Sequence, residues 1–329
     1  MIWFAWRVQR LYLLAATAAV AGIAIWFTIE GRHEEAMWSC LLDRIHPQGP
    51  SLYCSAAWTA YNFTHWNPFF YWVLYAVPGL LGVLLGAPLV AREFDHKTAR
   101  IAWTQSVTRA RWLGTKLLFV GVVVAALTAG VVALAEWWTG AVRAGATVLP
   151  DPFDVTGLAP ISYGVFAFLL GAALGAVLRR TGWTVFVAIP LFGLSRALLR
   201  FAVRPHLAST MTTASPTMTG LGWKQGWVLN TGYLPMGQLS PPTGKTWSSW
   251  ADVAQTCLFR SFVPIGPNSR MGVPALDRLC LTAHRLHYVI QFQPQSHYWQ
   301  LQVEESAIFL VVGFALAAIA FLAVRKRTV

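Results

Sequence analysis

Charged residues are scarce in this chain. Only 12% of its 329 residues are Asp, Glu, Lys or Arg, whereas 56% are hydrophobic. Soluble domains carry about 25% charged residues, so this composition excludes an ordinary soluble domain. It predicts instead a protein that crosses a membrane several times.

Motifs for catalysis and nucleotide binding are also missing. Residues 244–246 (GKT) look like the end of a P-loop, but Leu239 stands where that motif needs its first glycine. His284 and His287 could bind a metal from one face of a helix, yet no acidic partner stands at a suitable spacing. Surface histidines are the simpler interpretation. The sequence therefore predicts no catalytic site and no metal site.

Cysteine is rare, and none lies in an apolar run. Cys40, Cys54, Cys257 and Cys280 all fall in two long polar regions, 30–67 and 204–304. Four cysteines allow three pairings, and the short separations favour the disulfides Cys40–Cys54 and Cys257–Cys280. A crossed pairing between the two regions and unpaired buried thiols are the alternatives. An oxidising location outside the cell favours disulfides.

Six apolar runs are each long enough to span a bilayer. The first could also be read as a signal peptide, but it is long and lacks a good cleavage site, so a retained span is preferred. Trp and Arg residues in 1–10 predict an interfacial helix before it. Gly171 and Gly175 have a spacing that permits close helix packing. The runs are 11–29, 68–91, 117–136, 160–178, 183–203 and 305–324.

The basic residues gather on one side of this six-span arrangement. Almost all of the net charge of +12 lies in 1–10, 92–116, 179–180 and the tail 325–327. Short basic loops normally face the cytoplasm, so both termini are expected there, in a multi-pass protein of the cell membrane. Topology and anionic inner-leaflet lipid then account for the charge, and no nucleic-acid partner is needed.

The segment 92–116 mixes six basic residues with apolar ones. Ile101, Trp103, Val107 and Trp112 alternate with charged and hydroxyl side chains, which predicts a helix lying in the membrane interface. The alternative is a loop that only sets the topology.

Five charged residues lie at the other ends of the spans. Solvated carboxylates and snorkelling arginines are the simplest interpretation. Pairs of the two arginines with Glu136 or Glu304 are the alternative, because charges near a membrane are functional candidates. The residues are Glu136, Arg196, Arg200, Glu304 and Glu305.

Two stretches resemble a known family. The sequence AREFDHKTARIAWTQSVTRARWLGTKL (91–117) is similar to the cytoplasmic coupling segment of permease subunits in the second exporter type of ABC transporter. Residues 280–305 resemble the end of the outer region in actinobacterial permeases of that type. The resemblance covers the full length, but Lys97-Thr98 stands where the family often has Gly-Thr. The outer region is also larger than in simple members.

The resemblance implies a transport subunit that is not itself an enzyme. Two copies of a separate cytoplasmic ATPase would hold ATP and magnesium, and this chain would bind no cofactor of its own. A second permease copy, expected as a homodimer, would complete the exporter, with the first, second and fifth spans at the dimer interface. The residues expected to couple to the ATPase are Glu93, Asp95, Thr98, Trp103, Arg109, Arg111 and Lys116.

The expected fold is an all-α polytopic membrane protein with six transmembrane helices. Residues 1–10 form an interfacial helix, and 11–203 hold spans one to five with the outer loop 30–67 and the cytoplasmic coupling helix 92–116. Residues 204–304 form a large irregular extracellular region, and 305–329 form the sixth span and a basic tail. A polytopic sensor or scaffold whose outer region binds a ligand, and a membrane enzyme with an outer site, are the alternative functions.

Overall fold

A computed structural model describes most of the chain. The described residues are 2–43, 67–95, 108–143, 152–215, 226–243, 245–249, 262–264, 272–274 and 283–326. They form two compact units. Unit 1 comprises Met1–Phe201 and Gln302–Val329, and unit 2 comprises Ala202–Leu301.

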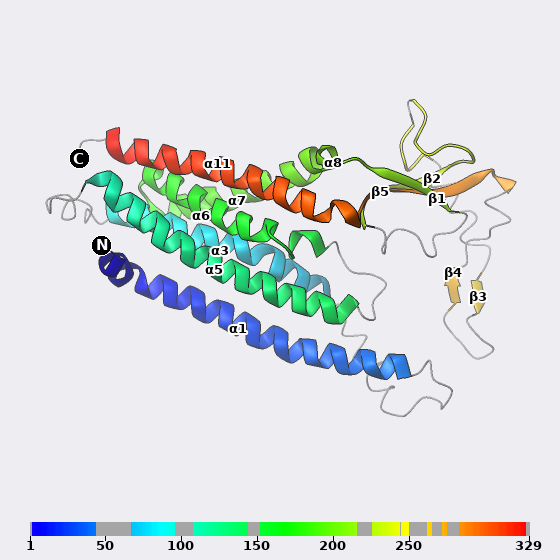
Figure 1. Cartoon of the computed structure of the whole chain (residues 1–329), viewed down its shortest axis with the longest axis horizontal. Coiled ribbons are helices and arrows are strands. Elements are labelled where there is room, and N and C mark those ends of the chain that lie inside the picture. Colours follow the sequence, from blue (N-terminus) through cyan, green and yellow to red (C-terminus); the bar gives the residue numbers. More distant parts are fainter. Residues whose placement is uncertain are drawn as a thin grey trace. The chain divides into compact units, whose positions relative to one another are not determined.

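Unit 1 is a bundle of long helices (Figure 1). Six described helices are long and apolar enough to cross a membrane, which confirms the six predicted spans. They are α1 (Ile2–Asp43), α3 (Asn67–Asp95), α5 (Arg109–Arg143), α6 (Ala159–Leu178), α7 (Thr181–Leu198) and α11 (Tyr298–Lys326). Both chain ends lie at the end of the bundle where α3 ends and α5 begins (Figure 1), here called the basic end.

Short elements connect these helices. The 3-10 helix η2 (Pro152–Asp154) precedes α6, and a π-helical turn η3 (Leu199–Val203) extends α7 into α8 (Arg204–Leu207). Between α6 and α7, Arg179 adopts φ 59° and donates its N–H to the Gly175 carbonyl. This cap ends α6, and the chain reverses at Arg179 and Arg180 before α7 begins at Thr181.

Helices α3 and α6 form the centre of the bundle. A Cβ atom at Gly82 would lie 2.3 Å from the Gly164 carbonyl oxygen, and one at Gly86 would lie 2.2 Å from the Phe168 carbonyl oxygen. On α6, a Cβ atom at Gly171 would lie 2.9 Å from the Ala87 nitrogen, and one at Gly175 would lie 2.8 Å from the Ala87 carbonyl oxygen of α3. Small residues thus let the two backbones touch, as the spacing of Gly171 and Gly175 predicts.

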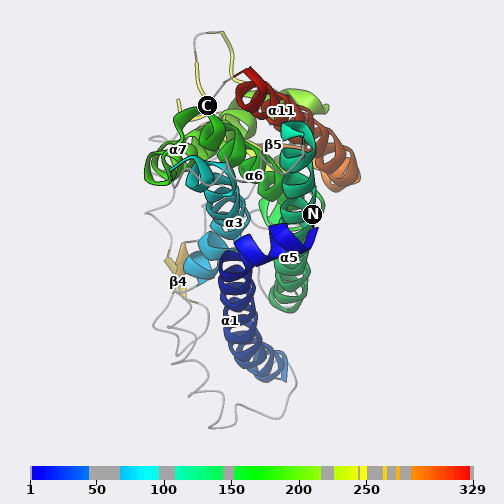
Figure 2. The ribbon, with the colours of Figure 1, turned by 90° about the vertical axis from the view of Figure 1, so that its left-hand side faces the viewer.

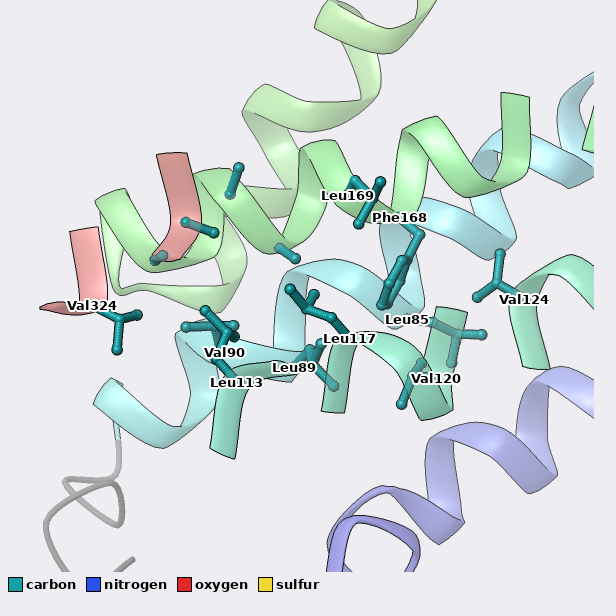
Figure 3. Packing of buried hydrophobic residues seen from close by; sticks show 14 of the residues in the cluster. Leu85, Leu89, Val90, Leu113, Leu117, Val120, Val124, Phe168, Leu169 and Val324 are labelled. Carbon is teal, nitrogen blue, oxygen red and sulfur yellow. The ribbon is translucent and has the colours of Figure 1, made fainter. Parts of the chain in front are cut away.

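Apolar side chains from five helices, α1, α3, α5, α6 and α11, fill the space beside this contact. Figure 3 shows Leu89 from α3, Leu113 from α5 and Phe168 from α6 within one cluster, with Val324 of α11 at its edge. Helix α1 packs mainly on α5, and Figure 2 shows its first turns running at an angle to the rest of the helix. The stretch predicted as a separate interfacial helix, 1–10, is therefore continuous with the first span from Ile2 onward.

The 92–116 segment departs from the single interfacial helix that was predicted. Its first residues, 92–95, are the last turn of α3, and residues 109–116 are the first turns of α5. Residues 96–107 lie outside the described part. The predicted boundaries were wrong because residues 92–95 continue α3 and residues 109–116 already belong to α5.

Unit 2 contains strands where an irregular region was expected. β5 (Leu286–Pro294) lies between β1 (Met211–Ser215) and β2 (Gly226–Pro235), and both pairs are antiparallel. β3 (Phe262–Pro264) pairs with β4 (Gly272–Pro274). The sheet was missed because long connections separate its strands, so no hairpin signal joins them in the sequence.

Two tyrosines lie side by side on neighbouring strands of the sheet. Tyr233 of β2 is in register with Tyr288 of β5, and their ring centroids lie 5.3 Å apart. Burial, with a smaller contribution from Tyr288, raises the pKa of Tyr233 to about 12. The phenol therefore stays neutral at physiological pH and stabilises the sheet as an aromatic pair.

Candidate functional site

Two groups of polar residues, most of them buried or half-buried, mark the two ends of unit 1. The first, at the basic end, is the ion pair of Glu93 and Lys116. The second surrounds the linker between α5 and α6 and is here called the linker hub. Its residues are Tyr75, Glu136, Asp154, Tyr163, Arg196, Arg200, Gln302 and Glu305. On α3, the 18 positions from Tyr75 to Glu93 span about 27 Å, close to the thickness of a hydrocarbon core.

The ion pair joins the end of α3 to the start of α5. The Lys116 ammonium donates a hydrogen bond to Glu93 Oε1, and both side chains are buried. Lys116 Nζ also lies 4.4 Å from the centroid of the buried Trp112 ring. Apolar surroundings strengthen the attraction between the two charges, so the two helix ends are held together.

Other contacts tie the end of α3 to more of the bundle. The Arg92 guanidinium lies 5.4 Å from the Tyr12 ring of α1, and Arg179 lies 4.9 Å from the Phe94 ring. The carboxylate of Asp95 accepts the Thr181 N–H at 3.5 Å. The basic end of α3 therefore contacts α1, α5 and the turn before α7.

The predicted coupling residues separate into two kinds. Glu93 and Lys116 face each other inside the bundle, whereas polar residues facing a partner were expected. Asp95 and Arg111 are exposed, and Arg109 is half-buried. Thr98 and Trp103 lie outside the described residues. The part that each plays in coupling stays a prediction.

Thr108 fixes the start of α5. Its hydroxyl accepts the Arg111 N–H at 3.3 Å, and its carbonyl accepts the Trp112 N–H at 3.0 Å. This is the arrangement of an N-cap residue, which satisfies donors that a helix start leaves free. The cap sets the rotation of the first turn, so Trp112 and Lys116 point inward while Arg111 points outward.

At the linker hub, one carboxylate receives two arginines. Asp154 is fully buried at the end of η2. Its oxygens lie 3.3 Å from Arg196 Nη2 and 2.5 Å from Arg200 Nη1. The two arginines are one turn apart on α7 and its continuation, so both reach the same carboxylate.

Arg196 is enclosed by aromatic rings as well. Its guanidinium lies 4.3 Å from the Tyr75 ring centroid and 3.7 Å from that of Tyr163. The Tyr163 hydroxyl donates to Glu305 Oε1 of α11. Cation–π contacts of this kind strengthen when water is excluded, and they connect α7 to α3, α6 and α11.

The linker itself is held by side chains of α5 and α11. Gln302 Nε2 donates to the carbonyls of Phe153 and Thr156, each at 3.1 Å, and its Oε1 accepts the Ala159 N–H at 2.6 Å. Glu136 accepts the Gly157 N–H at 3.1 Å. Two side chains thus make four hydrogen bonds to the backbone of residues 152–159, and such bonds are what buried backbone groups require.

These contacts correct the interpretation of the boundary charges. Arg196 is 3% exposed and does not snorkel, and in the part of the chain that the structure describes, Asp154 is the acid that lies within ion-pair distance of both arginines. Glu136 binds the linker backbone, Glu305 binds Tyr163, and Glu304 is half-buried.

Sequence reasoning missed Tyr75, Asp154, Tyr163 and Gln302. Tyr75 and Tyr163 were counted as ordinary residues of apolar spans, and Asp154 as part of a polar connection. The available signal was the position of Asp154, which is an acid within five residues of a span that begins at Ala159.

The predicted disulfides cannot be located in the described chain. Cys54, Cys257 and Cys280 lie outside the described residues, and of Cys40 only the backbone is described. His284 lies in a turn, and His287 lies on β5 with its Nε2 at 2.9 Å from the Gln238 carbonyl. Within the described ranges, no group of His, Cys, Asp and Glu residues could hold a metal ion.

Comparison with known proteins gives one match. Residues 10–204 match the model of a family described as ABC-2 membrane transporter related. The matched range runs from the third turn of α1 to the start of α8, and so includes the ion pair and the hub residues from Tyr75 to Arg200. No curated protein and no solved structure matches the chain.

Proposed function

The chain belongs to the ABC-2 membrane transporter related family, and we propose that it is the permease subunit of an ATP-driven exporter. In this proposal, two copies of a cytoplasmic ATPase subunit supply ATP hydrolysis and hold ATP and magnesium. Two permease copies, as a homodimer, form the translocation pathway. The chain itself then carries no ATPase site and binds no cofactor.

The ion pair of Glu93 and Lys116 is the observation that carries this proposal beyond the family. The pair joins the last turn of α3 to the first turns of α5, the two helices on either side of residues 96–107. A force applied at these helix ends would therefore move both helices together. α3 in turn touches α6 along its backbone through Gly82 and Gly86. Rigid packed elements of this kind are able to carry a motion from a docking surface into the spans.

Co-purification tests this function directly. The full chain, isolated from its native membrane in mild detergent, is expected to bring down an ABC ATPase. In vesicles, the complex should hydrolyse ATP and move substrate outward. A chain that brings down no ATPase, and whose outer region binds a ligand, would favour the sensor or scaffold instead.

The topology gives a separate prediction. A cysteine in place of Thr108, before α5, should react with an impermeant thiol reagent only from the cytoplasmic side. A cysteine in place of Lys245, in unit 2, should react only from outside, since the three spans α5, α6 and α7 lie between the two positions and an odd number of spans places them on opposite sides. The unsubstituted chain reports any reaction of the native cysteines. Reaction of position 108 from outside would show that the chain is inserted in the opposite orientation.

Arginine substitutions at the start of α5 test the docking surface. Arg111→Ala and Arg109→Ala are each expected to weaken ATPase binding about tenfold, because an interface arginine paired with a carboxylate contributes more than a solvated one. Lys245→Ala, which removes an exposed charge in unit 2, is the matched control. Binding of the purified ATPase is measured by titration. If all three variants bound the ATPase equally well, residues 92–116 would serve only to set the membrane topology.

A further inference from the structure

We propose that Asp154 is a positioning residue for transport: it holds the far end of α7 against the linker, and the transport cycle opens this contact. The contact of Asp154 with Arg196 and Arg200 is here called the α7 latch. The inference rests on the proposed transport function. It concerns residues for which neither the family match nor the sequence gives a role.

The three residues of the α7 latch differ in how deeply they are buried. Asp154 is fully buried, Arg196 is 3% exposed, and Arg200 is 26% exposed. Water can therefore reach Arg200 first. Arg196 lies deeper, between the rings of Tyr75 and Tyr163. Opening would begin at Arg200 and would reach Arg196 only when the end of α7 moves away.

Away from the latch, α7 makes small apolar contacts. Ala188 packs with Val83 of α3 and Ala167 of α6, and the Phe192 ring lies against Gly79. Its opposite face is exposed, with large side chains at Trp183, Phe186, Leu194 and Leu198. Among these contacts the latch is the charged one, and it holds the far end of α7 to the linker.

The backbone of α7 has two points where it can bend. Pro190 removes a helical hydrogen bond within the span. The π-helical turn η3 contains Arg200 at its second position, and such turns are frequent where a helix must reposition a side chain. The half of α7 beyond Pro190 can therefore move while the first half stays packed.

The linker is the fixed partner in this contact. Gln302 makes three hydrogen bonds to it, and Glu136 makes a fourth. α7 has no comparable attachment to the linker except through its two arginines, among the contacts that the structure describes. An opening of the latch would thus move α7 and leave Asp154 in place.

Charge makes this contact suitable for opening and closing. A buried ion pair loses about as much hydration as it gains in attraction, so it adds little to static stability compared with apolar residues. For the same reason, the closed pair differs little in free energy from an open state in which water reaches both the arginines and the Asp154 carboxylate. A modest force from the ATPase end is then enough to shift the balance.

Hydrogen exchange of the purified full chain tests the positioning role without any transport. In Asp154→Asn, which keeps the shape and removes the charge, amides of residues 191–203 should exchange at least about tenfold faster, while those of α6 stay unchanged. Lys245→Gln is the control for loss of a charge. If Asp154→Asn does not fold, Arg200→Gln at the exposed member is expected to give the same local change. Unchanged exchange in 191–203, or a uniform increase that includes α6, would overturn the latch.

A cross-link tests whether the latch must open. Asp154→Cys and Arg200→Cys are combined and joined by a short reagent that forms a cleavable disulfide with each thiol. In vesicles, the cross-linked complex should lose at least about tenfold in ATP-driven efflux relative to the same double variant before cross-linking, while still hydrolysing ATP. Reduction should return efflux to the level of that uncross-linked variant. The unsubstituted chain, treated in the same way, controls for native cysteines.

The outcomes separate this inference from the proposed function. Full efflux with the cross-link formed would show that the latch need not open, although the exporter would stand. If the untreated, unsubstituted complex showed no ATP-driven efflux, the exporter would fall, while hydrogen exchange would still decide whether Asp154 holds α7.

Discussion

Lys116→Ala is expected to lower the free energy of unfolding by about 3–5 kcal/mol, the usual cost of removing one partner of a buried ion pair. The substitution takes away the cation that faces Glu93, whose side chain is only 9% exposed. It also removes the ammonium that lies over the Trp112 ring. Unfolding of the purified chain, followed by SDS titration in mixed micelles, measures the change.

A double-mutant cycle shows whether the pair is the cause. Glu93→Gln with Lys116→Ala should be more stable than Lys116→Ala alone, because no charge then stays in the apolar site. Lys245→Ala, at an exposed position, should change stability by less than about 0.5 kcal/mol. Strictly additive effects of the two inner substitutions would show that Glu93 and Lys116 do not interact.

The same pair is expected to affect coupling. Glu93→Gln keeps the shape of the side chain, so it should allow insertion while it loosens the joint between α3 and α5. ATP hydrolysis by the assembled complex should then continue with less efflux per ATP. A variant in which hydrolysis and efflux fall together would indicate lost assembly and would not support a coupling role.

The spans could be predicted from the sequence because their signal is local. An apolar run of about 20 residues needs no knowledge of its neighbours to be recognised as a span. Likewise, the spacing of Gly171 and Gly175 within one helix indicates close packing, and the structure places both against α3.

The polar contacts could not be predicted because they join distant parts of the chain. Asp154 meets Arg196 and Arg200 only once α6 and α7 have packed, and Gln302 reaches the linker from the last helix. The sequence places Asp154 a few residues before a span, but it does not show that Arg196 and Arg200 will reach it. Glu93 and Lys116 were placed at a partner surface for the same reason: the sequence shows charge near a span end, and tertiary packing decides whether it faces inward.

The second large effect is expected at the contact of α3 with α6. In Gly86→Ala the new methyl group would lie 2.2 Å from the Phe168 carbonyl oxygen. A backbone atom in the middle of a packed helix cannot move aside as a flexible side chain can. The helices must separate, and we expect a loss of about 3 kcal/mol or more in the free energy of unfolding, at the upper end of overpacking costs. Gly86→Leu should prevent folding.

Gly130 on α5 is the matched control for this prediction. It also lies within a span helix, but a Cβ atom there would meet nothing within 4 Å. Since alanine is favoured over glycine in a helix by about 1 kcal/mol, Gly130→Ala should be neutral or slightly stabilising. The same Gly→Ala change is thus expected to lower the free energy of unfolding at position 86 and to leave it unchanged or slightly higher at position 130. SDS titration measures both variants. If Gly86→Ala were as stable as Gly130→Ala, α3 and α6 would not touch through their backbones. The path from the ion pair to the rest of the bundle would then need another contact.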